Sequence, residues 1–346
     1  MNQLQHITDP KIIRVGRIGY INVAPVYYGL EQAGTPSHIR LISQPPAVLN
    51  RMMEQGMIDI SPVSSAAFAR NHHDWSLLPN LSISAFGKVM SVLLVSNHPL
   101  EKLENRNILL SDESASAADM LKLILSWKKI FPQFETGAIH PDNSSTWENH
   151  DAVLVIGNSA LTGGWQNRFQ YVYDLGELWK QVTGLPFVFA VWAVRKTFAR
   201  ENSRIVTDIA GHFERSKQLG RMNMPEIRKA ASNLLNLDPN ECRTYFEKLQ
   251  YGLGHFELQG LKTFYQGLYA EKIVPERVKL SFFPTLIQGK KTKSLIGPES
   301  AYILSGYMKS INRQKAALLN LGLIHLPLPL KKVFPQLLHL FRQGRP

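Results

Sequence analysis

Short apolar runs rich in valine and isoleucine alternate with longer amphipathic stretches along the first part of the chain. Residues 12–21, 38–43 and 57–64 have strand character, whereas residues 25–34 and 46–56 have the apolar spacing of helices. This alternation is typical of parallel strands connected by helices. It predicts an α/β domain.

The same alternation restarts near residue 95, which indicates a second lobe. Strand-like runs at residues 107–112 and 151–157 flank a helical stretch at residues 114–130. Two further apolar runs, residues 88–96 and 186–194, lack polar alternation, so both are expected to be buried on two faces. We interpret these two runs as the crossings between the lobes.

Helical stretches after residue 194 would complete the first lobe, which makes that lobe discontinuous in sequence. We expect residues 13–94 and 193–273 to form lobe 1 and residues 95–192 to form lobe 2. Two α/β lobes hinged by paired strands are the architecture of type 2 periplasmic binding proteins, whose ligands lie in the interlobe cleft. The predicted fold class is therefore α/β and two-lobed, like a type 2 periplasmic binding protein.

Residues 274–346 break this pattern, because charged and proline-containing clusters interrupt short apolar runs. The chain has a formal charge of +12, and this C-terminal extension holds 12 basic and 2 acidic residues, so the body is nearly neutral. A nucleic-acid partner is therefore not expected for the body. The basic extension allows weak contact with an anionic membrane surface or with nucleic acid, but a solvated appendage is the simpler interpretation.

A single cysteine, Cys242, excludes an intrachain disulfide and multi-cysteine metal sites. No apolar window reaches the roughly 18 to 20 residues that a membrane-spanning helix needs. Residues 1–16 also lack the apolar core of a signal peptide. We expect a cytoplasmic protein.

Motifs for metals and cofactors are missing from the sequence. His72 and His73 are adjacent, and adjacent residues on a helix point in different directions, so these two are not expected to share a metal ion. There is no dinucleotide-binding GxGxxG after a strand, no phosphate-binding GxxxxGK[ST] and no GxSxG nucleophile elbow. We expect a protein that works without metal or cofactor.

Several hydroxyl and amide side chains lie where a predicted strand turns into a helix. Asn22 follows the first strand, Ser64 follows the third, and Ser114 and Ser116 open the first long helix of lobe 2. This edge of an open α/β sheet faces the ligand crevice, and a helix N-terminus favours a carboxylate. Each residue can equally be a simple helix cap. Ser91 lies inside an apolar run instead, where its hydroxyl needs either a backbone partner or a position facing the cleft.

Five longer motifs resemble the chorismate dehydratase family of the futalosine route to menaquinone. They are RIGYINVAPVYYGL (17–30), IDISPVSSAAFARN (58–71), VMSVLLVS (89–96), SDESAS (111–116) and YDLGELWKQVTGLPFVFAVW (173–192). The resemblance runs from about residue 13 to about residue 273. It implies the two-lobed binding-protein fold and loss of water from chorismate, which gives 3-[(1-carboxyvinyl)oxy]benzoate.

Asn22 matches the active-site asparagine of this family, and Ser91 matches the serine of its VxSVLLxS motif. We therefore expect Asn22 and Ser91 to be catalytic and to bind chorismate. The other expected substrate-binding residues are Ser64, Ser114, Ser116 and Asn158. No Asp, Glu or His in these motifs has an obvious position for a general base, so we hypothesise that the enolpyruvyl carboxylate of the substrate takes the ring proton.

The chain departs from the family pattern at three places. Asn158 replaces the usual aspartate, Val182 replaces the usual tryptophan, and residues 86–88 read Phe-Gly-Lys where Asp-Gly-Pro is usual. Asn158 has nearly the shape of aspartate but lacks its charge. We expect these changes to leave the fold intact and to affect activity or substrate choice.

A rival function uses the same residues. A solute-binding or sensory protein of this fold would bind a small carboxylate without transforming it. The missing export signal argues against transport, and formation of an aromatic product from chorismate would separate the two functions. The sibling lyase that opens cyclic futalosine also has this fold, but its usual N-terminal and His-bearing motifs are not found here.

Overall fold

The computed structural model describes residues 12–284 of the chain. These residues belong to one compact unit. The predictions made for the basic extension fall mostly on residues 285–346 and therefore lie outside the described residues.

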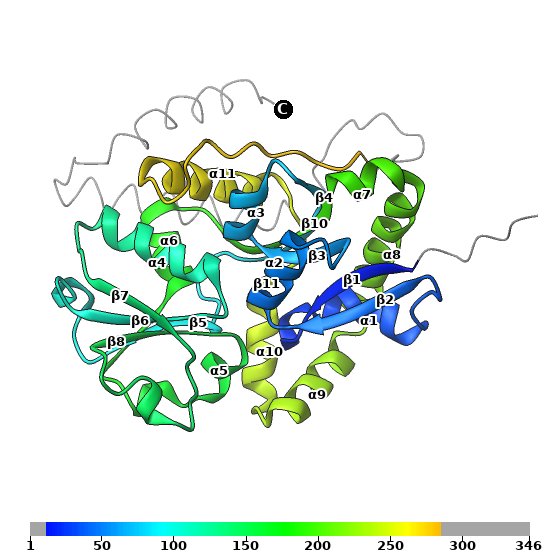
Figure 1. Cartoon of the computed structure of the whole chain (residues 1–346). Helices are drawn as coiled ribbons and strands as arrows, with labels where there is room; N and C mark the ends of the chain where they lie inside the picture. The colour runs from blue at the N-terminus through cyan, green and yellow to red at the C-terminus, as the bar shows by residue number, and fades with distance from the viewer. Residues whose placement is uncertain (1–11, 285–346) are drawn as a thin grey trace, which may run out of the picture. The chain divides into compact units, whose positions relative to one another are not determined.

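Two β-sheets form the framework of this unit (Figure 1). The first sheet consists of β1 (Ile13–Ile18), β2 (Ile39–Gln44), β3 (Ile60–Ser64), β4 (Trp75–Ala85), β10 (Phe187–Arg195) and β11 (Leu249–Gln250). The second consists of β5 (Val92–Ser96), β6 (Asn107–Ser111), β7 (Gln133–Gly137), β8 (Ala152–Ile156) and β9 (Tyr171–Asp174). Their strand orders are β11-β4-β10-β3-β1-β2 and β7-β6-β8-β5-β9, which confirms the prediction of two α/β lobes.

Both sheets are mixed, whereas the sequence pattern predicted parallel strands. β1 pairs in parallel with β2 and β3, but β10 runs antiparallel to β3 and β4. In the second sheet β6 is parallel to β7 and β8, and β5 is antiparallel to β8 and β9. Apolar runs buried on two faces read alike in either direction, so the sequence does not reveal the reversed strands.

Helices surround the two sheets. Those encoded before β5 and after β10 are α1 (Ala24–Gln32), α2 (Pro46–Glu54), α3 (Ser65–Asn71), α7 (Lys196–Glu201), α8 (Ser203–Met222), α9 (Met224–Leu235), α10 (Pro239–Lys248) and α11 (His255–Ala270). Those between β5 and β10 are α4 (Ala115–Trp127), α5 (Gly157–Thr162) and α6 (Leu175–Thr183). Short 3-10 turns are η1 (Ile21–Val23), η2 (Leu100–Lys102), η3 (Ser144–Thr146) and η4 (Trp165–Asn167). No helix between residues 12 and 284 is both long enough and apolar enough to cross a membrane.

The two long apolar runs begin at the crossings between the lobes and then continue as strands of one sheet: residues 88–91 lie in the connection from β4 to β5, and Pro186 directly precedes β10. β5 pairs only with strands of the second sheet, and β10 pairs only with strands of the first. Both strands are buried on two faces because each is central in its sheet and is packed against helices, β5 against α5 and α6 and β10 against α3 and α11. The chain changes sheet between Ala85 and Val92 and again between Asp174 and Phe187, so the boundaries expected at 94/95 and 192/193 fall inside strands.

Residues 274–284 are part of the body, although the sequence pattern assigned them to the extension. The backbone N–H of Leu77 in β4 donates to the carbonyl of Ser281, and the N–H of Phe283 donates to the carbonyl of Leu77, both at 2.8 Å. Val274 and Phe283 are buried. The apolar residues of this short segment therefore pack on the first lobe rather than forming a unit of their own.

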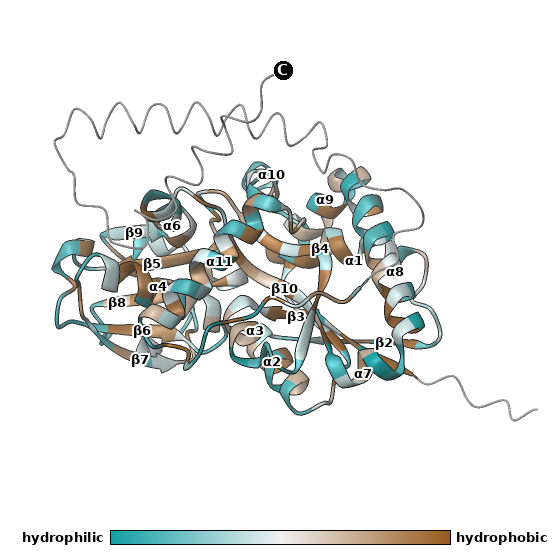
Figure 2. Ribbon diagram, turned by 90° about the horizontal axis from the view of Figure 1, so that it is seen from above, coloured by the Kyte–Doolittle hydropathy of each residue, from teal (hydrophilic) through white to brown (hydrophobic). Residues whose placement is uncertain are grey.

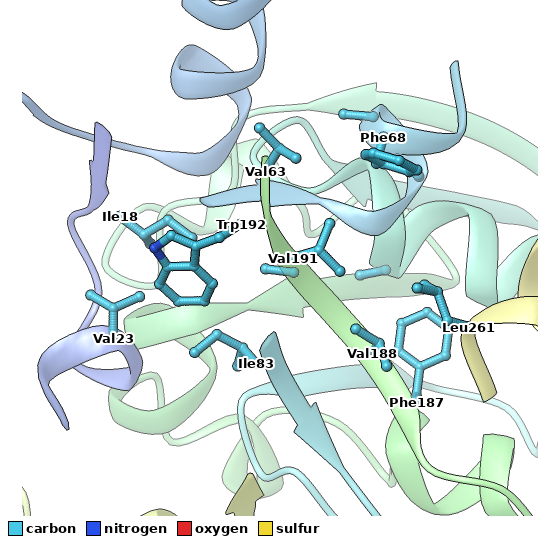
Figure 3. Close-up of a cluster of buried hydrophobic side chains, with 14 of the residues drawn as sticks. Ile18, Val23, Val63, Phe68, Ile83, Phe187, Val188, Val191, Trp192 and Leu261 are labelled. Carbon is cyan, nitrogen blue, oxygen red and sulfur yellow. The ribbon is translucent and has the colours of Figure 1, made fainter. Parts of the chain in front are cut away.

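The core of the first lobe is centred on β10 (Figure 3). Trp192 of β10 lies among Ile18, Val23 and Ile83, and Phe187 lies near Leu261 of α11. Figure 2 shows apolar residues along the strands of both sheets and polar residues on outer helices such as α8. One continuous cluster of buried apolar side chains extends through both lobes. Such packing gives the turns at the strand ends a firm scaffold.

Candidate functional site

Asn22 lies in η1, the short turn that connects β1 to α1. Neither η1 nor α1 has a side-chain cap among the described residues, so the interpretation of Asn22 as a helix cap is wrong. The Asn22 Oδ1 atom is buried and has no hydrogen-bond partner within residues 12–284. Leaving a buried acceptor unpaired costs about 1–3 kcal/mol, which calls for an explanation such as a ligand.

Ser91 lies in the connection that leads from the first sheet into β5. Its carbonyl accepts the N–H of Gly157 at 2.8 Å, and its hydroxyl accepts a hydrogen bond from the Tyr245 hydroxyl at 3.3 Å. Burial raises the pKa of Tyr245, which keeps this hydroxyl protonated as a donor. Because Ser91 Oγ accepts from Tyr245, its own O–H remains available to donate to a third group.

The first turn of α5 meets the β1–α1 turn through a glycine. Gly157 has a φ of +61°, and a Cβ at this position would lie 2.7 Å from the ring of Tyr20. Only glycine combines this backbone conformation with so close a ring contact. Asn158 follows directly, and its Oδ1 is also buried without a partner in the described part of the chain. Gly157 therefore contacts two of the predicted segments. Ser91 binds it directly, Tyr20 lies two residues before Asn22, and Asn158 follows Gly157 in the chain.

Tyr20 also contacts the turn between β6 and α4. Its hydroxyl donates a hydrogen bond to the carboxylate of Glu113. Burial is the first cause of the raised pKa of Tyr20, and the hydrogen bond to Glu113 raises it further, so the hydroxyl is a neutral donor. Tyr20 therefore joins the two lobes beside Asn22.

The serines at the start of α3 already have partners. Ser64 is the N-cap of α3, and its hydroxyl accepts the N–H of Ala67 at 3.1 Å and an amide N–H of Asn50 at 3.3 Å. The N–H of Ala66 donates to the hydroxyl of Ser116 at 3.0 Å. Two N–H groups at this helix end, those of Ala66 and Ala67, are therefore bound by side chains and are not open to an anion.

Ser114 and Ser116 have different roles. Ser114 is the N-cap of α4 and accepts the N–H of Ala117 at 3.2 Å, so the capping interpretation is confirmed for it as for Ser64. Ser116 is buried and links α4 to α3 across the lobes. Substrate contacts of Ser64, Ser114 and Ser116 stay a prediction.

An ion pair strengthens the contact between α3 and α4. Arg70 lies 2.7 Å from the buried carboxylate of Asp119. Burial raises the pKa of Asp119, and the charge of Arg70 opposes that rise without cancelling it. The lobes are thus held together at α3–α4 and at Tyr20–Glu113.

The connection before Ser91 is held by a residue that the sequence analysis did not select. The Asp174 carboxylate accepts the N–H groups of Val89 and Met90, the shortest contact being 2.7 Å, and it caps α6. Met90 has a φ of +64°, a conformation that costs a residue other than glycine of order 1–3 kcal/mol. Asp174 belongs to the YDLGELW motif, which is the signal that could have identified it. The departure at residues 86–88 leaves this support in place.

A surface pocket of about 280 Å³ lies elsewhere on the first lobe. It is lined by Ile12, Arg14, Asp59, Arg195, Thr197, Phe198 and Glu201, none of them an expected site residue. Burial alone would raise the pKa of Asp59, but hydrogen bonds from Arg14 and Arg195 outweigh it and hold the pKa below its ordinary value. Because its central charges pair with one another, we regard this pocket as structural.

His72 and His73 do not point apart as expected. α3 ends at Asn71, and His72 and His73 follow at its end, so helical geometry does not separate the two rings. Their ring centroids lie 4.0 Å apart. The geometric argument that the two cannot share a metal ion is therefore wrong.

Comparison with known proteins identifies the family. A family model described as menaquinone biosynthesis matches residues 13–270. A chorismate dehydratase of Thermus thermophilus is 32% identical over 276 residues, which cover 74% of this chain and 96% of that protein.

Two solved structures share the fold. A protein of Archaeoglobus fulgidus aligns with a TM-score of 0.62 at 18% identity, over 76% of this chain and 98% of its own. The periplasmic aliphatic sulphonate binding protein of Escherichia coli aligns with a TM-score of 0.54 at 17% identity, over 85% and 99%. These similarities confirm the predicted fold class, a two-lobed α/β fold like that of periplasmic binding proteins. By its sequence match, the chain belongs to the menaquinone biosynthesis family of the chorismate dehydratases.

Proposed function

We propose that this chain is a chorismate dehydratase, a hydro-lyase that converts chorismate into 3-[(1-carboxyvinyl)oxy]benzoate and water on the futalosine route to menaquinone. The observation that supports the proposal is that the segments of Asn22 and Ser91, the two residues that match family site motifs, both contact Gly157: Tyr20 lies against it, and the Ser91 carbonyl accepts its N–H. We place the activity in the cytoplasm, in keeping with the single cysteine.

The unpaired groups suit the functional groups of chorismate. The substrate has two carboxylates, which only accept hydrogen bonds, and one ring hydroxyl, which can also donate. The buried amide oxygens of Asn22 and Asn158 each need a donor, and the ring hydroxyl of chorismate, with its single O–H, can donate to one of them. The amide N–H groups of the same residues and the Ser91 O–H would donate to a carboxylate. One substrate would thus pair all but one of these groups.

The reaction needs positioning more than strong acid or base chemistry. The C–H bond at the ring carbon that bears the enolpyruvyl ether breaks, and its electrons complete the aromatic ring. The C–O bond to the ring hydroxyl breaks, and the hydroxyl leaves as water with a proton. We assign the proton transfer to the enolpyruvyl carboxylate, which Asn22 and Ser91 would hold in place.

The direct test is to incubate the full-length protein with chorismate and to follow the aromatic product by ultraviolet absorbance and mass spectrometry. We expect stoichiometric conversion to 3-[(1-carboxyvinyl)oxy]benzoate, with neither metal nor coenzyme added. Tight binding of chorismate without product would contradict the proposal and favour a solute-binding or sensory protein.

Glu113 offers a second test, because it is the carboxylate that Tyr20 places beside the proposed site. If the substrate supplies its own base, Glu113→Gln should keep kcat within about threefold of the original, since glutamine still accepts from Tyr20. KM should stay the same or fall, because a negative charge near a dianion is removed. Steady-state kinetics measure both values. A loss of kcat of about 100-fold or more would instead identify Glu113 as the general base.

A further inference from the structure

A second cluster of reactive side chains lies at the C-terminal end of α3. The helix is 7 residues long, so this end is about 10 Å from the end that carries Ser64. One ring nitrogen each of His72 and His73 and one carboxylate oxygen of Glu276 lie within 4.8 Å of one another. None of these residues takes part in the proposed reaction.

The buried member of the cluster has an unused nitrogen. His72 is 3% exposed, and its Nδ1 lies 3.0 Å from the carbonyl oxygen of Ala69. The Nδ1–H donates to that carbonyl, so the lone pair of the neutral ring is on Nε2. This Nε2 is buried and has no hydrogen-bond partner within residues 12–284. A fixed ring with an unpaired lone pair is the arrangement in which proteins hold metal-binding histidines.

The other two members are exposed and can adjust. His73 Nε2 lies 2.6 Å from Glu276 Oε1, and the two side chains are 56% and 55% exposed. Ligands about 2.1 Å from a tetrahedral ion lie roughly 3.4 Å from one another. Rotation of these two exposed side chains is therefore enough to gather the ligand atoms around an ion.

We propose that His72, His73 and Glu276 bind one Zn²⁺ ion. Two imidazoles and one carboxylate form a three-ligand set that zinc accepts, with water as the fourth ligand. Lys196 is a nearby cation, and its Nζ donates to the carbonyl oxygens of His72 and His73 at 3.0 and 2.8 Å. Lys196 therefore does not occupy the ring nitrogens or the Glu276 carboxylate. Its positive charge reduces the affinity of the site for Zn²⁺.

The proposed ion has a structural role. His72 and His73 lie at the end of α3, and Glu276 lies 203 residues after His73, in the segment that follows α11. The same segment pairs with β4 through Ser281 and Phe283. Zinc would therefore tie residues 274–284 to the end of α3, and it should raise the melting temperature of the protein.

The test uses full-length protein without a histidine tag, treated with a chelator and then titrated with Zn²⁺ alone against a coloured zinc indicator. We expect one tight equivalent and a rise in Tm. His73→Asn and Glu276→Gln should each weaken zinc binding by at least roughly 10–100-fold, because changing a residue outside the ligand set already costs that much. Both residues are exposed, so neither variant should prevent folding.

The matched control is Glu135→Gln, because Glu135 pairs with His150 at 3.1 Å without a third ligand. This control should bind zinc as tightly as the unmodified protein. The proposal is overturned if zinc binds only at roughly millimolar concentrations, or if His73→Asn and Glu276→Gln bind it unchanged. It is also overturned if Glu135→Gln weakens binding as much as they do.

Discussion

Replacing Asn22 with alanine is expected to lower kcat/KM for chorismate by roughly 100- to 1,000-fold, the usual cost of losing one preorganised polar group in an active site. Stability should hardly change. The Asn22 Oδ1 is buried and has no partner within the described residues, so truncation removes an uncompensated group rather than a stabilising hydrogen bond. Steady-state kinetics and a melting curve on the same preparation measure the two effects.

Two further variants show whether the loss of activity is specific to the amide of Asn22. Asn22→Asp keeps the shape but replaces the amide donor with a negative charge, so it should be at least as inactive as Asn22→Ala on a dianionic substrate. Asn223→Ala is the matched control, because Asn223 is a half-buried asparagine between α8 and α9 that takes no part in the site. Normal turnover by Asn22→Ala would remove this residue from the proposed mechanism.

The division into two lobes was predictable because buried strands need continuous apolar runs, and β8 and β10 are such runs. Their pairing was not predictable. A strand inside a sheet and a strand that crosses between lobes are both buried on two faces, so the pattern alone could not show that most of each run pairs within one sheet as β5 or β10. The role of each run depends on the strands with which it pairs, and those strands come from distant parts of the chain.

The candidate site could be proposed from the sequence where one residue carries the signal. Asn22 and Ser91 stand in short motifs whose spacing survives in this chain. The residues around them were missed because tertiary packing brings them in. Tyr245 lies 154 positions from the serine that it contacts, and Glu113 lies 93 positions from Tyr20. No local pattern encodes such contacts.

The histidine pair shows how a sound rule can fail at the end of an element. Adjacent residues point apart on a helix, but His72 and His73 come just after α3 has ended. Helix ends are the least predictable part of a sequence-based assignment. A difference of one or two residues there decided whether the two rings could meet.

Replacing Ser91 with alanine is expected to reduce kcat by roughly 100-fold, because the Ser91 O–H is the donor that would hold a substrate carboxylate. Unlike Asn22→Ala, this variant should also lose stability. The Tyr245 hydroxyl donates to Ser91 at 3.3 Å and is buried, so truncation leaves that hydroxyl unpaired at a cost of about 1–3 kcal/mol. A lower Tm alone would therefore not separate a catalytic serine from a structural one.

The double variant Ser91→Ala, Tyr245→Phe separates the two roles. Removing both partners of a buried hydrogen bond is nearly neutral, so the double variant should regain most of the lost Tm but none of the lost kcat. Ser96→Ala is the control: Ser96 is another buried serine, at the end of β5, and its hydroxyl donates to the carbonyl of Asp151. It should lower Tm and leave kcat unchanged. If activity returned together with stability in the double variant, Ser91 would be structural, and the hold on the substrate carboxylate would have to come from Asn22 and Asn158.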